Sequence, residues 1–330
     1  MTLSVVSSAF LTTLAALTVG SWAGWRLLRR RRPVSAVAVL VLSLVLSTAS
    51  VASAVNTYFT YAPRVRDVVS LVGGTPGGVL RLRVPDRGSG FGASEALVWL
   101  PPQYAAEPTR RFPVVYLFHG SPGVPADWFR GGEAAEAAAA LARAGAPLIL
   151  VAPRMSHGWL DDPECVDGAH ERVETHFVRD VVPAVDTSLR TVAARSARVV
   201  GGMSAGGYCA LNLGLRNRAL VSAIIDMSGD VAPTHAGGLA PVFGPGPGLA
   251  FGARANSPAA YATTLAPSPT TRVWFDCGTS DTALLRGIRR ISAVLAARGF
   301  PVVVRVRPGG HTFRVWRPAL AESLAWASGR

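Results

Sequence analysis

Apolar residues fill the first sixty positions in two long runs. Residues 3–25 and 34–55 carry no charged side chain, and the segment RLLRRRR at 26–32 separates them. Each run is long enough to cross the hydrocarbon core of a bilayer as a helix, which takes about 20 residues. Neither run has a polar face, which argues against two core helices of a soluble domain. We therefore expect residues 1–60 to form a membrane anchor of two transmembrane helices.

The arginines between the two runs predict the orientation of this anchor. Arginine-rich loops beside membrane spans stay on the cytoplasmic side, so the N-terminus and everything after residue 55 should lie outside the cytoplasm. In a second interpretation, residues 34–55 are the apolar region of a signal peptide, because ASVASAV at 49–55 offers small residues suited to cleavage. Both interpretations export the rest of the chain.

After a linker at 61–75, the pattern changes to short apolar runs that alternate with segments of helical periodicity. We expect strands at 77–85, 96–102, 112–120, 146–153, 197–204, 221–229, 271–278 and 301–310, and helices at 133–145, 173–190, 205–217, 282–299 and 313–327. Such alternation predicts one α/β domain at 76–330, a mostly parallel sheet with helices on both faces and a site at the carboxyl ends of its strands. Residues 231–258, rich in glycine and proline, are expected to form a surface loop or lid.

Composition narrows the classes of function. The 330 residues carry a formal charge of +13, but they contain no lysine, and an arginine-only basic complement is typical of a GC-rich genome. Basic residues do not interleave with aromatic ones, so we expect no nucleic-acid partner, and attraction to anionic lipid is the better interpretation. Neither the three cysteines nor the histidines show a metal-ligand spacing, and we expect no metal and no cofactor.

The cysteine content does not decide whether the domain contains a disulfide. Cys165, Cys209 and Cys277 allow one disulfide in an exported domain, and at least one thiol must stay unpaired within the monomer. The sequence does not say which two would pair. We interpret Cys209 and Cys277 as small buried apolar side chains.

The pentapeptide GMSAG at 202–206 fits the pattern G-x-S-x-G. It follows a predicted strand and precedes a predicted helix, which is the setting of a nucleophile elbow, where small flanking residues allow a sharp turn that exposes the serine hydroxyl. The alternative is a plain strand-to-helix crossing, which explains the glycines but gives Ser204 no role. The context favours Ser204 as a nucleophile.

Two partners follow in the chain order that this fold requires. Asp281 comes just after one late strand and His311 just after the last. Asp281 could instead cap the following helix, and Asp276 is a rival acid that lies inside its strand. His311 would accept the proton of Ser204, and Asp281 would fix and stabilise the imidazole.

The oxyanion that forms when the serine attacks a carbonyl also needs hydrogen-bond donors. The N–H of Ala205 is the expected first donor. The second is expected from the segment HGSPG at 119–123, where the N–H of Ser121 is the best candidate because Pro122 has no N–H. His119 is expected to shape this loop, and His157 is a candidate pocket residue.

Taken together, HGSPG, ETHFVRDVVPAVDTSLRT, GGMSAGG, CGTSD and GGHTFRVWRPAL resemble the Putative esterase family of α/β-hydrolases, from about residue 76 to the C-terminus. That family includes esterase D (S-formylglutathione hydrolase), feruloyl and enterochelin esterases, and mycolyltransferases. The resemblance implies the α/β-hydrolase fold, with Ser204, Asp281 and His311 as the triad and Ser121 and Ala205 as oxyanion donors. It also implies a packing role for Trp316, and Glu174 matches the family's helix-opening glutamate, which we interpret as structural.

We therefore expect a membrane-anchored, extracytoplasmic serine esterase or acyltransferase that acts through an acyl-enzyme, with envelope lipids or acylated glycans as candidate substrates. The alternative is a non-catalytic envelope-binding protein on the same scaffold. A transporter or receptor is disfavoured, because the apolar runs contain no ionisable residue to line a pathway.

Overall fold

The computed structural model describes residues 5, 7–30, 32–62, 78–162 and 164–329. The chain divides into two compact units, one of Met1–Gly74 with Thr312–Arg314 and one of Thr75–His311 with Val315–Arg330. The predicted linker at 61–75 lies, apart from its first two residues, outside the described part of the chain.

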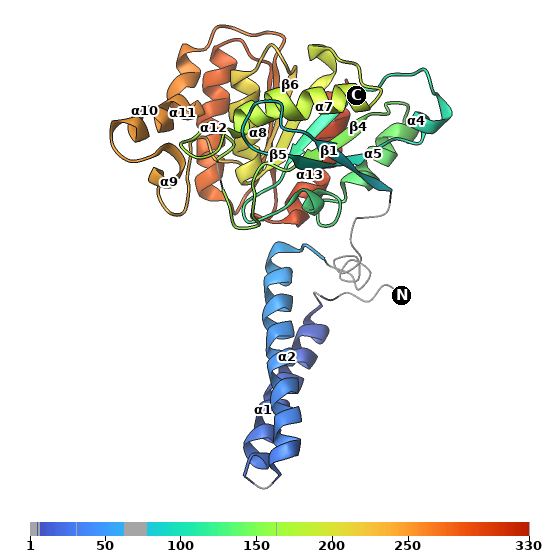
Figure 1. The fold of residues 1–330 in the computed structure, drawn as a ribbon, viewed down its shortest axis with the longest axis vertical. Coiled ribbons are helices and arrows are strands. Elements are labelled where there is room, and N and C mark those ends of the chain that lie inside the picture. Colours follow the sequence, from blue (N-terminus) through green and yellow to red (C-terminus); the bar gives the residue numbers. More distant parts are fainter. Residues whose placement is uncertain (1–4, 6, 31, 63–77, 163, 330) are drawn as a thin grey trace. The chain divides into compact units, whose positions relative to one another are not determined.

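The N-terminal unit consists of two helices, α1 (Ser8–Leu28) and α2 (Pro33–Phe59) (Figure 1). Hydrogen bonds between side chains join them: the Trp22 indole donates to Ser47 at 2.9 Å, and the hydroxyls of Thr18 and Ser50 lie 2.9 Å apart. Many other hydroxyls donate to a carbonyl one turn earlier in their own helix, which leaves few polar groups without a partner in an apolar environment.

One helix in the described residues is long and apolar enough to cross a membrane, at Ser35–Thr57 within α2. The expectation of two spanning helices is therefore not confirmed. Both helices form, but glycine, serine, threonine and tryptophan dilute the apolar residues of α1. The absence of charge, on which the prediction rested, is a weaker criterion than mean hydropathy.

The second unit is built on one eight-stranded sheet in the order β1-β2-β4-β3-β5-β6-β7-β8. The strands are β1 (Val79–Val84), β2 (Ser94–Trp99), β3 (Val114–Phe118), β4 (Ile149–Pro153), β5 (Arg198–Met203), β6 (Ala223–Met227), β7 (Arg272–Gly278) and β8 (Val302–Arg307). β2 pairs antiparallel with both β1 and β4, and all other pairs are parallel. The eight predicted strands and the α/β-hydrolase fold are confirmed.

Helices cover both faces of this sheet (Figure 1). The helices of this unit are α4 (Gln103–Ala106), α5 (Ala134–Arg143), α6 (Val173–Thr175), α7 (Val182–Ser188), α8 (Ala205–Arg216), α9 (Ala240–Phe243), α10 (Pro247–Ala255), α11 (Pro258–Tyr261), α12 (Thr282–Ala297) and α13 (Phe313–Ala327). The chain moves towards one edge of the sheet from β3 to β4 and towards the other edge from β5 to β8. Because each connection is right-handed, α5 lies on one face of the sheet and α7, α8 and α12 lie on the opposite face. The direction reverses beside β3, and there the loops after β3 and β5 diverge and leave room for a site.

Two local features differ from the predictions. The segment at 231–258 is partly helical, because prolines occupy the first turns of α9, α10 and α11, where a missing N–H costs nothing. The predicted helix at 173–190 forms, but it contains a π-helical stretch at His176–Val181.

A disulfide joins Cys165 to Cys209, so the interpretation of Cys209 as an unpaired apolar side chain is wrong. Its burial was expected correctly, but its partner lies 44 residues earlier and no local pattern marks the pair. Cys277 is a buried free thiol, as expected.

Candidate active site

Ser204 lies on the sharp turn between β5 and α8. Its backbone has φ 56° and ψ −128°, a conformation that costs a residue with a side chain about 1–3 kcal/mol. The turn is held on both sides: the Ser204 N–H donates to the carbonyl of Met227 on β6, and its carbonyl accepts from Gly207 and Tyr208. The neighbouring strand and helix thus impose a strained conformation on this serine.

The two glycines of the pentapeptide are sterically required. A Cβ at Gly202 would lie 1.8 Å from the carbonyl oxygen of Gly206, and a Cβ at Gly206 would lie 2.1 Å from that of Phe118. Real Cβ atoms do not approach so closely. The glycines therefore allow α8 to start directly against β3 and β5.

Ser204, His311 and Asp281 form one hydrogen-bonded chain. His311 Nε2 lies 2.7 Å from Ser204 Oγ, and His311 Nδ1 lies 2.7 Å from Asp281 Oδ2. A carboxylate can only accept, so Nδ1–H donates to Asp281 and Nε2 accepts from the Ser204 hydroxyl. The three side chains come from the ends of β5, β7 and β8.

The two candidate acids, Asp281 and Asp276, make different contacts. Asp281 begins α12 at its N-cap position, but its side chain accepts no capping hydrogen bond. Asp276 is fully buried in β7 and pairs with Arg307, Nε to Oδ2 at 2.7 Å. Burial raises the pKa of Asp276 to about 6, against the opposing effect of Arg307. Asp276 is thus engaged by arginine rather than by His311.

The loop after β3 lies against the serine. β3 and β5 are adjacent and parallel, with Phe118 opposite Gly202, so their loops start side by side. A Cβ at Gly120 would lie 3.3 Å from the Cβ of Ser204. Among the described residues, neither the Ser121 N–H nor the Ala205 N–H donates a hydrogen bond, so both predicted oxyanion donors are uncommitted.

His119 and Trp316 support this arrangement. His119 Nδ1 donates to the carbonyl of Gly120 at 2.9 Å, and burial lowers the pKa of this imidazole, which favours its neutral form. Trp316 packs edge-on against the His311 ring at 4.9 Å, and its indole donates to Ser228 at 3.3 Å. The packing position expected for Trp316 therefore matches its contacts.

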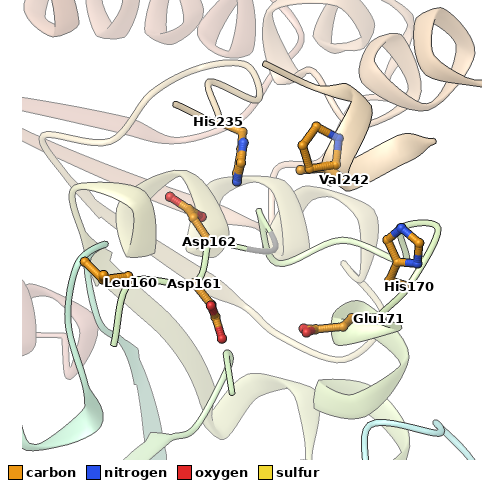
Figure 2. Close-up of a pocket in the computed structure, with 9 residues that line it drawn as sticks. Leu160, Asp161, Asp162, His170, Glu171, His235 and Val242 are labelled. Carbon is orange, nitrogen blue, oxygen red and sulfur yellow. The ribbon is translucent and has the colours of Figure 1, made fainter. Parts of the chain in front are cut away.

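An acidic pocket of about 270 Å³ lies next to the loop after β3 (Figure 2). The pocket is lined by Leu160, Asp161, Asp162, Gly168, His170, Glu171, His235, Pro241 and Val242. The Gly123 N–H donates to the carbonyl of Trp159 at 3.0 Å, and this bond ties the residue before Leu160 to that loop.

Two further carboxylates contact Thr234, which precedes the pocket residue His235. Asp230 follows β6 and accepts from the Thr234 hydroxyl at 3.0 Å, and Glu164 accepts from the Thr234 N–H at 2.9 Å. Sequence reasoning missed the acidic residues of both loops. The available signal was the run of residues between Arg154 and Arg172, which holds five carboxylates and no arginine.

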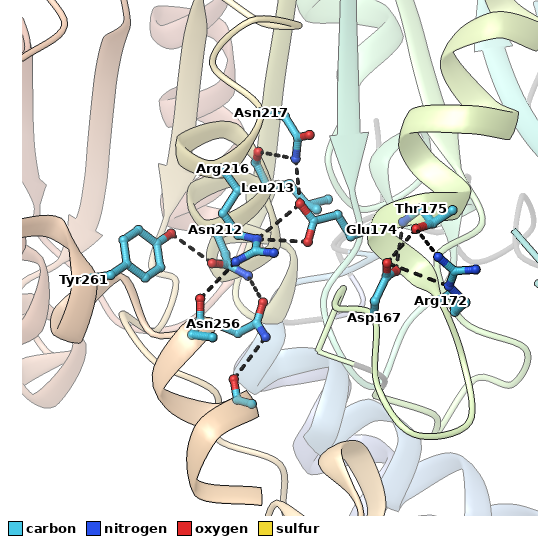
Figure 3. A network of polar contacts seen from close by, with 12 residues as sticks. Asp167, Arg172, Glu174, Thr175, Asn212, Leu213, Arg216, Asn217, Asn256 and Tyr261 are labelled. Carbon is cyan, nitrogen blue, oxygen red and sulfur yellow. Dashed lines mark hydrogen bonds and ion pairs between the residues drawn. The ribbon is translucent and has the colours of Figure 1, made fainter. Parts of the chain in front are cut away.

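Glu174 lies in a polar network away from Ser204 (Figure 3). Its carboxylate accepts from Arg216 at 2.9 Å and Asn217 at 2.8 Å at the end of α8. One turn earlier in α8, Asn212 contacts Asn256 and Tyr261. The network links α6, α8 and the segment of α10 and α11, which matches the structural role expected for Glu174.

The remaining histidines have local partners. His157 stacks on Phe91, which stacks in turn on His176, and His157 lies 3.9 Å from Glu171. His170 and His235 line the acidic pocket, and His157, a candidate pocket residue, is not among the residues that line it. In the described part of the chain, no three His, Cys, Asp or Glu side chains are placed to hold a metal ion.

Comparisons with known proteins agree with this fold. A family model described as Putative esterase matches residues 93–327. An uncharacterised protein of Corynebacterium glutamicum is 28% identical over 258 residues, which are 74% of this chain and 59% of that protein. An esterase of Mycobacterium tuberculosis is 28% identical over 247 residues, 66% of this chain and 52% of its own length. The chain thus spans little more than half of these relatives.

Among solved structures, a ferulic acid esterase superposes with a TM-score of 0.65 at 22% identity. The match covers 76% of this chain and 97% of the esterase. At that identity the superposition establishes the fold alone.

Proposed function

Since the chain belongs to the Putative esterase family, we propose that it is a membrane-anchored, extracytoplasmic serine esterase or acyltransferase that uses Ser204 as its nucleophile. One observation carries the proposal. Ser204 occupies a strained turn with its hydroxyl 2.7 Å from His311, whose other nitrogen is 2.7 Å from Asp281. Nucleophile, base and orienting acid are therefore in hydrogen-bonding contact before any substrate binds.

Acylation begins when Ser204 Oγ attacks the ester carbonyl. His311 Nε2 takes the hydroxyl proton as the Oγ–C bond forms, and the Asp281 carboxylate stabilises the imidazolium. The carbonyl electron pair moves onto oxygen, where the N–H groups of Ala205 and Ser121 are the donors for the oxyanion.

The tetrahedral intermediate then collapses. The bond to the alcohol oxygen breaks, the leaving group takes the proton from His311, and the acyl group stays on Ser204. In the second half, His311 deprotonates a water or an acceptor alcohol, which attacks the acyl-enzyme and releases the acid or a new ester. Water makes the protein an esterase, and an alcohol makes it an acyltransferase.

A fluorophosphonate probe tests this function, because it reacts covalently with an activated serine. We expect the purified full chain to label and Ser204→Ala to remain unlabelled. Ser196→Ala, which removes an exposed hydroxyl away from the turn, is the matched control and should label like the parent chain. Unlabelled parent protein would favour a non-catalytic envelope-binding protein, and equal labelling of Ser204→Ala would contradict the assignment of Ser204 as the nucleophile.

Three observations support the proposed location. Ser35–Thr57 has the length and hydropathy of a span, five arginines stand at 26–32, and Cys165 and Cys209 form a disulfide of the kind that persists in oxidising compartments. α1 would be the second span of the hairpin.

Topology is tested with a thiol reagent that does not cross membranes. In intact cells it should reach a cysteine at Asn56 and spare one at Arg29, both in a Cys277→Ala background. The reverse pattern would contradict the proposed orientation.

The anchor would hold the site close to the bilayer, which makes envelope lipids and acylated glycans accessible substrates. Lipid profiles of cells that carry the parent chain or Ser204→Ala test this: an acylated lipid or glycan should accumulate in the variant. Identical profiles would exclude these substrate classes.

A further inference from the structure

The carboxyl end of β6 lies between β5, which leads to Ser204, and β7, which leads to Asp281. Ser228 is the first residue after β6, and it is fully buried. Its N–H donates to the carbonyl of Asp276 on β7 at 2.8 Å. The carbonyl just before it, that of Met227, accepts from the N–H of Ser204 at 2.9 Å. Ser228 is therefore built into the same edge of the sheet as the proposed triad.

The backbone of Ser228 adopts a costly conformation. Its φ of 54° lies in the left-handed region, which glycine enters freely and a residue with a side chain does not. Glycine would suit this backbone better, and what serine adds is a buried hydroxyl. The contacts of that hydroxyl therefore indicate what this residue contributes.

The Ser228 hydroxyl accepts a buried hydrogen bond from the indole of Trp316, with 3.3 Å between Oγ and Nε1. Trp316 lies on α13 and is itself buried. An indole has a single N–H, so this bond fixes the direction in which the ring points. The ring lies edge-on to the imidazole of His311, with the two centroids 4.9 Å apart and the planes at 85°. Ser228 thus acts on His311 through one intervening side chain.

The packing of Trp316 matters most after acylation. Before the reaction, His311 has a hydrogen-bond partner at each ring nitrogen, Ser204 at one and Asp281 at the other. In the acyl-enzyme, Ser204 Oγ carries the acyl group and has no proton to donate to Nε2. The imidazole then keeps its bond to Asp281 and its contact with Trp316. A tilted ring would be misplaced as the base for the incoming water or alcohol, and such misplacement lowers kcat.

We propose that Ser228 is a positioning residue: its hydroxyl orients Trp316, and Trp316 keeps the His311 imidazole aligned for proton transfer. This inference rests on the proposed function, because it concerns the same triad. Ser228 acts through another side chain, so the loss of its hydroxyl should lower kcat without weakening substrate binding.

Two substitutions at Ser228 separate positioning from stability. Ser228→Ala removes the hydroxyl and keeps the strained backbone, whereas Ser228→Gly removes the hydroxyl and relieves the strain. Both should lower kcat on 4-nitrophenyl butyrate by about tenfold and leave KM within about twofold of the parent value. The Tm of Ser228→Gly should nevertheless exceed that of Ser228→Ala. If the hydroxyl only stabilised the fold, the folded fraction of both variants would keep the parent kcat.

A double-mutant cycle tests whether Ser228 acts through Trp316. Trp316→Phe removes the indole N–H and keeps an aromatic ring. Ser228→Ala should have no further effect on kcat in the Trp316→Phe background, because both changes remove the same hydrogen bond. Multiplied effects would contradict the proposed route. Ser323→Ala is the matched control: it removes a buried hydroxyl on α13 that donates to Leu320, and it should leave kcat unchanged.

The proton on His311 Nδ1 gives a readout that needs no turnover. A proton shared between imidazole and carboxylate resonates far downfield in a proton NMR spectrum of the full chain, and His311→Gln identifies this resonance by its loss. In Ser228→Ala and Ser228→Gly the proton should exchange faster with water, because the ring is held less firmly. The buried pair of His176 and Asp180, whose Nδ1 and Oδ2 lie 2.8 Å apart, gives a second such proton that should not change.

Either an unchanged kcat or an unchanged exchange rate of the His311 proton in Ser228→Ala would overturn the inference. Failure of the catalytic proposal would show differently, as an unlabelled Ser204 and no hydrolysis of any ester. In that case the exchange rate still decides whether Ser228 holds the imidazole.

Discussion

His311 Nε2 lies 2.7 Å from Ser204 Oγ although 107 residues separate the two in the chain. Ser204 follows β5 and His311 follows β8, and parallel strands carry their carboxyl ends to one edge of the sheet. The sheet therefore places the proposed base against the proposed nucleophile, and the predictions below follow from that placement.

The two aspartates of β7 and its following turn should behave differently. Asp281→Asn should lower kcat on a neutral ester by about 10⁴-fold, because the amide favours the wrong imidazole tautomer, with little change in unfolding free energy. Asp276→Asn should destabilise the fold by about 1–3 kcal/mol, because Arg307 loses a charged partner, while the folded fraction keeps its kcat. Steady-state kinetics and urea unfolding measure both effects. The assignment of Asp281 fails if Asp276→Asn is the substitution that abolishes kcat.

Two glycines should separate catalysis from folding. A Cβ at Gly120 would press on Ser204 Cβ at 3.3 Å, a contact that small shifts can relieve, so Gly120→Ala should lower kcat by roughly 10²-fold with little loss of stability. A Cβ at Gly206 would lie 2.1 Å from a backbone oxygen, so Gly206→Ala should prevent normal folding. Circular dichroism and ester hydrolysis distinguish the two. Full activity of Gly120→Ala would show that the loop after β3 lies farther from Ser204.

The order of elements was predictable, because buried parallel strands appear as continuous apolar runs and the intervening helices have three- and four-residue periodicity. The residue types at the strand ends also suggested Ser204, His311 and Asp281 as a candidate triad. The positions of the two aspartates were enough to prefer Asp281 as the candidate acid. A side chain inside a strand of a covered sheet is buried between layers, as Asp276 is.

Other features depend on contacts that the sequence does not encode locally. The Cys165–Cys209 bond joins a loop to α8, and no spacing distinguishes this pairing from the other two. The acidic pocket draws Asp162 and His235 from different loops, so neither stands out alone. The prolines at 241, 247 and 258 look like loop residues but lie in the first turns of helices.

The disulfide should contribute substantially to stability. A cross-link that closes a loop of this length reduces unfolded-state entropy by an amount worth about 4 kcal/mol in the chain-entropy model. Reduction should therefore lower the Tm of the parent chain by several degrees. A Cys165→Ala/Cys209→Ala double variant should melt at the same temperature with and without reductant. An unchanged Tm after verified reduction would contradict this prediction.

Asp226 should make stability fall with rising pH. Complete burial raises its pKa to about 8 from an ordinary value near 3.8, so the folded state binds a proton that the unfolded state releases between these values. The contribution is full below about pH 4 and is lost towards pH 8, at about 1.4 kcal/mol per pH unit. Asp226→Asn should show a flatter profile of unfolding free energy from about pH 5 to 8. If the parent chain and Asp226→Asn gave parallel profiles of unfolding free energy against pH, Asp226 would be ionised in the folded state.

The acyl-enzyme itself is the most direct test of the proposed mechanism. The chain has no lysine, so trypsin cuts only after arginine and releases residues 199–216, in which Ser204 is the only serine. The full-length protein is acid-quenched during turnover of a 4-nitrophenyl ester, reduced, digested and analysed by mass spectrometry. We predict the mass of the acyl group on Ser204 in the parent chain and none on this peptide in Ser204→Ala. Ester turnover without any acylated peptide, or with the acyl group on another residue, would contradict the account.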